Sequence, residues 1–519
     1  MRKVSVFDTT LRDGLKIAGI CLTNDEKIHI AKLLVNAGVT VLEVGFPAAS
    51  EDQYKSCCAI VDAIKEPVTF CVLARATNPG DFSIAKDVLS RTSKGRLHTF
   101  LPVSAMYRDH FLKRSFEDSL NIAQEAVKRA MDVAPEVEFS LVDAFRADIN
   151  DVFAMTEKVL SSGAYIINYA DTVGCATPWK VEALVGELKK RFGDSLRISI
   201  HCHNDLGLAT ANSFAALKAG AEQVHCTVNG IGERAGNTPL EELAVLIHLY
   251  GSEAGLSSSV VMNRLYPLSR VVERYTGVSL SAMKPLVGTN AFICDVTTPQ
   301  LGDTTEKPPF AVITPEQIGI PRPGEPLNRD TDFDTFKKRL ESIGYSLSDE
   351  NYQRAYDLFK DVAGKKEYLF DEDLEVIVHQ TLSQIPERYK LLYLNVSAGS
   401  IPVPHATVQL EIDGQIVQDA GFGHGPVDAA FKTIFRMVKR FPKLIRYEVN
   451  AATMGTDAQG QVLLRLQEED TVVDGRGVNT DIVMASALAL IDALNKLEAY
   501  RGKREISELS EDESWTVRL

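Results

Sequence analysis

Two histidines stand one residue apart in His201-Cys202-His203, inside the stretch RISIHCHND that begins at Arg197. The run before them is rich in β-branched and apolar residues, which predicts a strand. Side chains at positions i and i+2 of a strand lie on the same face, so the two imidazoles are expected to point together while Cys202 faces the other side. Two imidazoles at this spacing are a good beginning for a metal site.

Two more residues can complete that site if the strands that carry them close into a barrel. Asp13 ends the first predicted strand and supplies an anionic oxygen that balances a divalent cation, and Asn237, in NGIGERAGN after the last one, supplies a neutral oxygen. This set leaves two octahedral positions open, which suit a bidentate 2-oxo acid or water. The mixed nitrogen and oxygen ligands admit Zn²⁺, Mn²⁺ or Mg²⁺, and the sequence does not choose among them.

Other polar residues at strand ends are candidates for binding a substrate. Arg12 would place a fixed positive charge beside the metal, where it can stabilise an enolate or a developing alkoxide; the alternative is a salt bridge to a neighbouring strand end. Thr172 and Arg75 are expected to hold a carboxylate, or else to make hydrogen bonds at the barrel mouth. Glu43 joins this predicted substrate-binding set.

Eight apolar or β-branched runs along the first 250 residues predict the strands that position these groups. The runs begin at Val4, Val39, Val68, Arg96, Val137, Ala164, Arg197 and Gln223. Segments of helical periodicity separate them, as in Thr23 to Gly38, where Thr23 and Glu26 form a capping-box pair. Eight consecutive βα units in about 250 residues match a TIM barrel, with a doubly wound open sheet as the alternative. We favour the barrel because its strand ends converge on one mouth, whereas an open sheet would scatter the polar residues along an edge.

The predicted barrel is assigned to residues 1–265, and the regular alternation of strand and helix patterns stops after it. Residues 266–387 are expected to form a linker with helical subdomains, since Pro-rich and Gly-rich stretches are followed by amphipathic patterns. Alternating patterns with two interrupting helices predict a separate α+β domain over residues 388–502. Residues 503–519 are expected to be an acidic, mobile tail. The fold class is therefore α/β with an added regulatory-type domain.

Composition excludes several classes of protein. The net charge of −14 disfavours a nucleic-acid partner, and no apolar run is long enough for a membrane span. The first residues are charged and polar, so we expect no secretory signal. The cysteines form no CxxC pair and none follows Cys294, a usage typical of reduced thiols in the cytoplasm.

Four motifs, DTTLRDG, EVGFP, HCHNDLGLA and NGIGERAGN, closely resemble those of the DRE-TIM metallolyase family. This family comprises metal-dependent acyl-CoA condensing enzymes such as the 2-isopropylmalate, citramalate and homocitrate synthases. The resemblance implies that a metal holds a 2-oxo acid, that a base deprotonates acetyl-CoA or another acyl-CoA, and that the enolate attacks the ketone. By matching motif positions, it implies that Asp13, His201, His203 and Asn237 bind the metal, that Arg12 is catalytic, and that Thr172 contacts the substrate carboxylate.

The C-terminal motifs GHGPVDAA, GTDAQGQV and GRGVNTDIVMASA resemble the leucine-binding regulatory domain of the same family. The resemblance implies an amino-acid effector and a homodimer or higher oligomer. Gly425, Asp428, Asp457 and Asp481 are the candidate effector-binding residues.

The chain departs from the family pattern where acid–base groups are expected. The family reads RDGEQ where this chain has Arg12-Asp13-Gly14-Leu15-Lys16, and it places a glutamate where Val142 stands. A family histidine after the fourth strand aligns with Tyr107. After the barrel, the family has two histidines that align with Cys294 and Pro299 and a tyrosine that aligns with Phe310. General acid–base catalysis typically raises a reaction rate about 10²–10⁴-fold. We therefore expect that the chemistry of the second substrate has changed. Candidate replacement acids or bases are Tyr107 and Asp143, and also His98 and His225.

Three hypotheses follow. The first is a diverged condensing enzyme that joins an acyl-CoA to a non-standard 2-oxo acid. The second is an aldolase or decarboxylase that needs only the metal and the arginine and consumes no CoA thioester. The third is a catalytically silent paralogue that regulates an active partner, against which the complete ligand set argues.

Overall fold

The computed structural model describes most of the chain, in two compact units, Met1–Arg322 and Pro323–Leu519. The described residues are 1–292, 312–320, 327–342, 347, 349–364, 369, 374, 377–378, 381, 388–399, 403–451, 460–468 and 471–512. Four residues named above, Cys294, Pro299, Phe310 and Asp457, lie outside these ranges.

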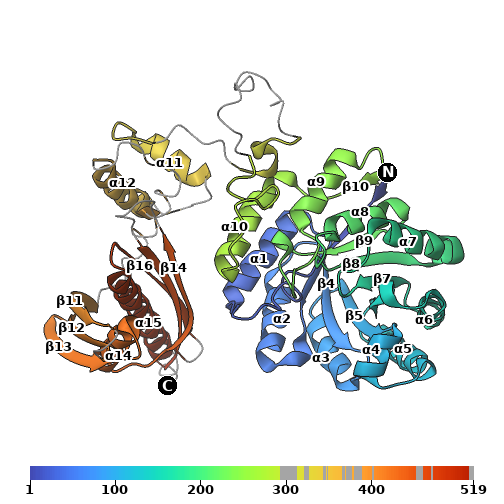
Figure 1. Cartoon of the computed structure of the whole chain (residues 1–519), viewed down its shortest axis with the longest axis horizontal. Helices are drawn as coiled ribbons and strands as arrows, with labels where there is room; N and C mark the ends of the chain where they lie inside the picture. Colours follow the sequence, from blue (N-terminus) through green and yellow to red (C-terminus); the bar gives the residue numbers. More distant parts are fainter. Residues whose placement is uncertain are drawn as a thin grey trace, which may run out of the picture. The chain divides into compact units, whose positions relative to one another are not determined.

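The first unit contains a closed barrel of eight parallel strands, which confirms the predicted fold (Figure 1). The strands are β2 (Ser5–Asp8), β3 (Val41–Gly45), β4 (Thr69–Arg75), β5 (Gly95–Pro102), β6 (Glu136–Val142), β7 (Ile166–Asp171), β8 (Arg197–Cys202) and β9 (Gln223–Cys226). The barrel closes where β2 pairs with β9, with Asp8 opposite Cys226. This closure brings the loop after the first strand beside the loops after the last two.

Helices cover the outside of the barrel. The main ones are α1 (Asn24–Asn36), α2 (Glu51–Ala63), α3 (Pro79–Leu89), α5 (Phe116–Met131), α6 (Ile149–Ser161), α7 (Pro178–Phe192), α8 (Ala209–Ala219) and α9 (Leu240–Tyr250), and a short α4 (Ala105–Tyr107) precedes α5. The capping box predicted for Thr23 and Glu26 starts α1. Outward-facing strand residues such as Leu97, Phe139 and Ile198 form the apolar core with these helices.

The interior of the barrel is unusually polar for a packed core. Arg96 is fully enclosed and lies 2.8 Å from Glu136 and 2.9 Å from Glu138. His225 lies 2.7 Å from Glu138, and its ring stacks on Phe7 with centroids 3.8 Å apart. Buried charges are tolerated only where they are paired and hydrogen-bonded, which is the case along this column of side chains.

The first unit continues beyond the last βα pair. Strand β10 (Leu256–Ser257) pairs in parallel with β1 (Arg2–Lys3), and α10 (Leu265–Thr276) packs against α1. Gly38, after α1, has φ of +87°, and a Cβ there would lie 2.1 Å from the carbonyl oxygen of Ser259. Only glycine allows the backbone at position 38 to approach Ser259 this closely, and the segment after β10 therefore packs directly against the end of α1.

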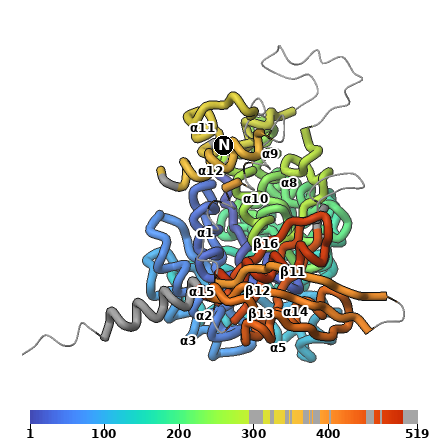
Figure 2. The backbone as a smooth tube through the Cα atoms, turned by 90° about the vertical axis from the view of Figure 1, so that its left-hand side faces the viewer, coloured from blue at the N-terminus to red at the C-terminus, as the bar shows by residue number. Residues whose placement is uncertain are grey.

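The second unit includes an α+β domain, and the helices before it include α11 (Phe333–Ser342) and α12 (Asp349–Ala363). One antiparallel sheet has β12 (His405–Ile412) between β11 (Tyr389–Ser397) and β13 (Gln415–Phe422), as Figure 2 shows, and the other has the order β14 (Lys443–Ala451), β15 (Gly460–Glu468), β16 (Thr471–Asn479). Helices α14 (Pro426–Val438) and α15 (Ile482–Asp512) complete the domain.

Two features of this unit were not expected from the sequence. Strand β16 is not among the predicted strands, because its glycines obscure the alternation; a Cβ on Gly475 or Gly477 would meet the backbone of α15. Helix α15 continues to Asp512, into the stretch expected to be a tail. Among the described residues, no helix is both long and apolar enough to cross a membrane.

Candidate metal centre

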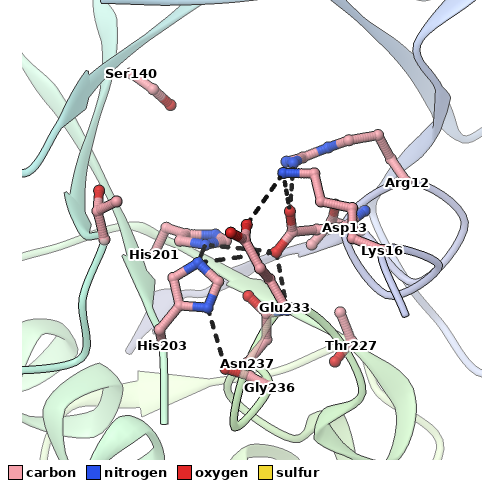
Figure 3. A network of polar contacts seen from close by, with 12 residues as sticks. Arg12, Asp13, Lys16, Ser140, His201, His203, Thr227, Glu233, Gly236 and Asn237 are labelled. Carbon is pink, nitrogen blue, oxygen red and sulfur yellow. Dashed lines mark hydrogen bonds and ion pairs between the residues drawn. The ribbon is translucent and has the colours of Figure 1, made fainter. Parts of the chain in front are cut away.

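The two histidines lie at the carboxyl end of β8 and face each other, as predicted. Their Nε2 atoms are 3.3 Å apart, and the rings meet edge to face with centroids 4.9 Å apart (Figure 3). Cys202, between them, is buried on the other side in the core between barrel and helices. The Nδ1–H of His203 donates to the carbonyl oxygen of Gly236, 3.2 Å away, so the lone pair of the neutral ring is on Nε2.

Asp13 supplies the anionic member of the cluster. Its Oδ2 lies 3.9 Å from Nε2 of His201 and 4.0 Å from Nε2 of His203. The three ligand atoms lie within 4.8 Å of one another, and all three residues are buried. A single ion between them could therefore contact all three donors after a small adjustment.

Asn237 reaches the same cluster from the loop after β9. Its Nδ2 donates to Oδ2 of Asp13 at 3.0 Å and to the carbonyl oxygen of Ile231 at 3.1 Å. Its Oδ1 is buried and has no hydrogen-bond partner. A buried carbonyl oxygen without a partner is costly, so a bound cation would satisfy it. Gly232, at φ +148°, makes room, since a Cβ there would lie 2.1 Å from Nδ2.

The protonation states of the cluster suit a cation. Burial lowers the pKa of His201 well below its usual value, with help from neighbouring His203, and burial also lowers the pKa of His203. Burial raises the pKa of Asp13, but Arg12 and the histidines outweigh it, so the net pKa is well below the usual value. Neutral imidazoles and an ionised carboxylate are the forms that bind metals.

Arg12 is held rigidly beside the cluster. Its Nε donates to Oε2 of Glu43 at 2.8 Å, and its Nη1 donates to Oδ1 of Asp13 at 2.7 Å. Glu43 is itself fixed by Thr9 at 2.6 Å and by Nδ1 of His98 at 2.7 Å. Burial raises the pKa of Glu43, but Arg12 and His98 outweigh it and lower it to about 2. Glu43 therefore contacts the arginine and orients it.

A second group of predicted residues gathers at the ends of β5, β6 and β7. The backbone N–H of Asp143 donates to Oγ1 of Thr172 at 2.8 Å. The Asp143 carboxylate binds Arg146 at 2.8 Å and accepts a short hydrogen bond from Ser104. The guanidinium of Arg146 lies over the ring of Tyr107, 5.6 Å from its centroid. Thr172, Asp143 and Tyr107 are thus brought together.

Arg75 is placed differently from the other predicted substrate-binding residues. Its Nε donates to Asp81 at 2.7 Å and its Nη2 at 2.9 Å, while the guanidinium lies over Phe46. Asp81 lies in the first turn of α3. Arg75 is therefore held in a local ion pair with Asp81 and does not contact Arg12 or the candidate metal ligands.

Comparison with known proteins places these motifs in a family. The HMGL-like family model matches residues 3–272, and the LeuA allosteric (dimerisation) domain model matches residues 368–498. The chain is 40% identical to 2-isopropylmalate synthase of Syntrophus aciditrophicus, over 96% of each chain. It is 39% identical to 2-isopropylmalate synthase of Dictyoglomus turgidum, over 97% of this chain and all of that one.

The chain belongs to the 2-isopropylmalate synthase family. Solved structures that are similar to this chain include the HMG-CoA lyase of Bacillus subtilis. It is 21% identical, and the match has a TM-score of 0.48 and covers 54% of this chain and 96% of that one.

Two residues at the candidate metal centre were not predicted from the sequence, namely Lys16 and Glu233. The ammonium of Lys16 lies 2.9 Å from Oδ1 of Asp13 and 3.5 Å from Oε2 of Glu233. By the resemblance described above, glutamine is expected where Lys16 stands, and this departure was the available signal. Nothing in the local sequence brings Glu233, from the loop after β9, to the loop after β2; the closure of the barrel does.

Val142 and the candidate replacement acids or bases lie in different surroundings. Val142 is the last residue of β6, at the barrel mouth. Tyr107 stacks on Phe111, with centroids 5.0 Å apart. His98 also lies 2.7 Å from Ser140, and His225 is bound to Glu138. Each candidate replacement acid or base thus has a structural partner already.

The predicted effector residues lie at helix starts in the LeuA domain. Gly425 precedes α14, and Asp428 in its first turn accepts from the N–H of His424 and from Lys432, both at 2.8 Å. Asp481 accepts from the N–H of Val483 at 2.7 Å, at the start of α15. Asp457, the fourth, lies outside the described residues.

Proposed function

We propose that this chain is a divalent-metal-dependent condensing enzyme that joins an acyl-CoA, with acetyl-CoA as the first candidate, to a 2-oxo acid. The product is a 2-alkylmalate. The names of the relatives support the reaction class, because both relatives named above are 2-isopropylmalate synthases. The substrate pair is proposed to be non-standard, for the reasons given below.

One observation carries the proposal: Asp13, His201 and His203 converge at the barrel mouth with the unpartnered Oδ1 of Asn237 and the fixed guanidinium of Arg12. These residues fit a divalent cation, and the mixed donors admit Mn²⁺, Mg²⁺ or Zn²⁺. A cation held there would polarise the ketone of a 2-oxo acid and hold its carboxylate. Active sites of TIM barrels form at this end of the strands.

Arg12 is proposed as the catalytic residue that stabilises developing negative charge. Glu43 and Asp13 hold two of its nitrogens, so its position does not have to be reorganised during the reaction. A base first removes a proton from the acyl methyl carbon. The new carbon–carbon bond then forms between this carbon and the keto carbon, and the keto oxygen becomes an alkoxide, which lies beside this guanidinium and takes up a proton. Water then cleaves the thioester, which releases the CoA thiol and leaves a second carboxylate.

Thr172 is proposed to bind the carboxylate of the 2-oxo acid. Its oxygen accepts from the backbone of Asp143, so its own proton is available to donate. The carboxylate of Asp143 is engaged by Arg146 and Ser104, which favours a positioning role for Asp143 over proton transfer. Arg75 remains a candidate only if it leaves Asp81.

The changed acid–base residues support a non-standard substrate. Val142 cannot transfer a proton, and the metal ligands and Arg12 are all retained. We infer that the 2-oxo acid is still bound while the chemistry of the second substrate has altered. Tyr107 is the candidate that replaces the lost proton donor or acceptor, because it lies beside Arg146 and the Thr172 group.

The same valine favours one second candidate, a lyase that acts on a 2-oxo acid. An aldolase or decarboxylase needs the cation and Arg12 to stabilise an enolate, and it needs no base for an acyl-CoA. Such an enzyme would form or cleave a carbon–carbon bond without consuming a thioester.

The LeuA domain supports a homodimer or higher oligomer and an amino-acid effector. We propose Gly425, Asp428 and Asp481, with Asp457, as the effector site. A cytoplasmic location stays a prediction from cysteine usage.

The deciding experiment is the release of free thiol from acetyl-CoA by the purified chain with Mn²⁺, Mg²⁺ or Zn²⁺ and a panel of 2-oxo acids. Release that depends on one 2-oxo acid is the expected result and names the substrate. No release across the panel while metal is demonstrably bound would reject condensation with acetyl-CoA. Disappearance of the 2-oxo acid in the same mixtures without thiol release would identify the lyase.

A further inference from the structure

The carboxylate of Asp13 has two differently used oxygens (Figure 3). Oδ2 faces the histidines and accepts from Asn237, whereas Oδ1 contacts Arg12 at 2.7 Å and Lys16 at 2.9 Å. Two cations thus lie against the carboxylate that also serves as the anionic metal ligand. Each positive charge there weakens the attraction of Asp13 for a divalent cation.

The two positively charged side chains, Arg12 and Lys16, differ in how firmly they are held. The side chain of Arg12 is 11% exposed and bound to Glu43 as well, so it is fixed. The side chain of Lys16 is 47% exposed, and its ammonium has a second carboxylate within reach, Oε2 of Glu233 at 3.5 Å. A lysine ammonium is a mobile point charge on a flexible stem, unlike a guanidinium held by two partners.

We propose that Lys16 is a built-in competitor of the divalent cation at Asp13, and that Glu233 receives its ammonium when the cation binds. The side chain therefore sets the free metal concentration at which the site fills. The inference rests on the metal-site part of the proposed function and not on the condensation itself.

The test is direct titration of the full-length chain, freed of metal by chelation, with Mn²⁺ in a calorimeter. Lys16→Met is expected to tighten Mn²⁺ binding about tenfold, a value that allows for the exposure of the ammonium. Lys16→Arg keeps the charge and should bind like the unchanged chain. The tightening should shrink in about 1 M salt, where exposed charges are screened within about 3 Å.

Two further variants separate this role from alternatives. Lys218→Met, an exposed lysine at the end of α8, is the matched control and should bind Mn²⁺ unchanged. Glu233→Gln should weaken binding in the unchanged chain but much less in the Lys16→Met background, because the ammonium is then absent. Equal weakening in both backgrounds would reject Glu233 as the receiving group.

Unchanged or weaker binding by Lys16→Met, with the same thermal unfolding midpoint as the unchanged chain, would overturn the proposal and leave Lys16 as a support for Asp13. Because the titration requires no turnover, this outcome is independent of the thiol-release assay. Absence of Mn²⁺ binding by the unchanged chain would instead reject the metal site itself.

Discussion

The side-chain oxygen of Thr172 accepts a 2.8 Å hydrogen bond from the backbone N–H of Asp143. Asp143 adopts φ of +62°, a left-handed conformation that is uncommon for residues other than glycine. Its carboxylate is fixed by Arg146 and Ser104, which hold the backbone in this conformation. The oxygen of Thr172 is therefore occupied as an acceptor on one side, and its own proton is left to donate to another group.

Thr172→Val should raise the KM for the 2-oxo acid about tenfold or more, because a hydrogen bond to a charged group is lost. The value of kcat should change less, since the contact is made before the reaction. Thr172→Ser keeps the hydroxyl and should behave like the unchanged chain. A lower kcat with an unchanged KM would contradict a substrate-binding role. Steady-state kinetics with the identified 2-oxo acid makes the measurement.

His203→Ala should abolish metal binding and leave the fold nearly intact. One of the converging donors is removed, and the remaining ones cannot hold the ion tightly. Metal content after dialysis against Mn²⁺ should fall to background while the far-ultraviolet circular dichroism stays the same. His248→Ala, an exposed histidine on α9, serves as the control. Full occupancy in His203→Ala would remove the histidine pair from the site.

Glu43→Gln should lower kcat about a hundredfold, because the charge that orients Arg12 is lost and a small misplacement of a catalytic group has effects of that size. The KM for the 2-oxo acid should change little. Exposed Glu182→Gln on α7 is the control for a lost carboxylate. An unchanged kcat in Glu43→Gln would show that Asp13 alone is enough to hold the guanidinium.

Stability should depend on pH through Asp8. Burial raises the pKa of this carboxyl from 3.8 to about 7, against the opposing hydrogen bonds from Thr10. The folded chain therefore binds a proton that the unfolded chain has released, and this stabilisation is present in full below about pH 4 and is lost as pH rises to about 7. The loss is on the order of a few kcal/mol.

Asp8→Asn cannot ionise, so its free energy of unfolding should rise relative to that of the unchanged chain between pH 5 and pH 8. Urea denaturation at both pH values, followed by fluorescence, measures this difference. Asp25→Asn on α1, where the side chain is exposed, should show no such trend. A constant difference for Asp8→Asn across this range would mean that Asp8 keeps its ordinary ionisation.

Val142→Glu should raise thiol release from acetyl-CoA, by up to about 10²–10⁴-fold, if the missing proton-transfer group is what limits the reaction. Val142→Gln has a similar size but cannot transfer a proton, and it should give no increase. No gain with glutamate would show that the surrounding residues, rather than one base, have diverged.

Much of the barrel follows from local patterns. The eight strands, the capping box at Thr23 and the shared face of His201 and His203 depend on alternation and helix-start chemistry within a few residues. Strand β16 was missed because its glycines, needed for close approach to α15, hide the alternation. At these positions the residue type is set by packing against α15, so the sequence lacks the alternation that would indicate a strand.

The sequence by itself determined which residue types stand at and after the strand ends, and so the candidate metal ligands, the arginine and the presence of a valine at position 142, which cannot transfer a proton. Only the tertiary structure decided the partners: that Arg75 pairs with Asp81, that Asp143 orients Thr172, and that Lys16 reaches Asp13 and Glu233. The physical reason is range. Alternation along a strand is fixed over two residues, whereas the contacts between the loops after β2 and β9 exist only because the barrel closes.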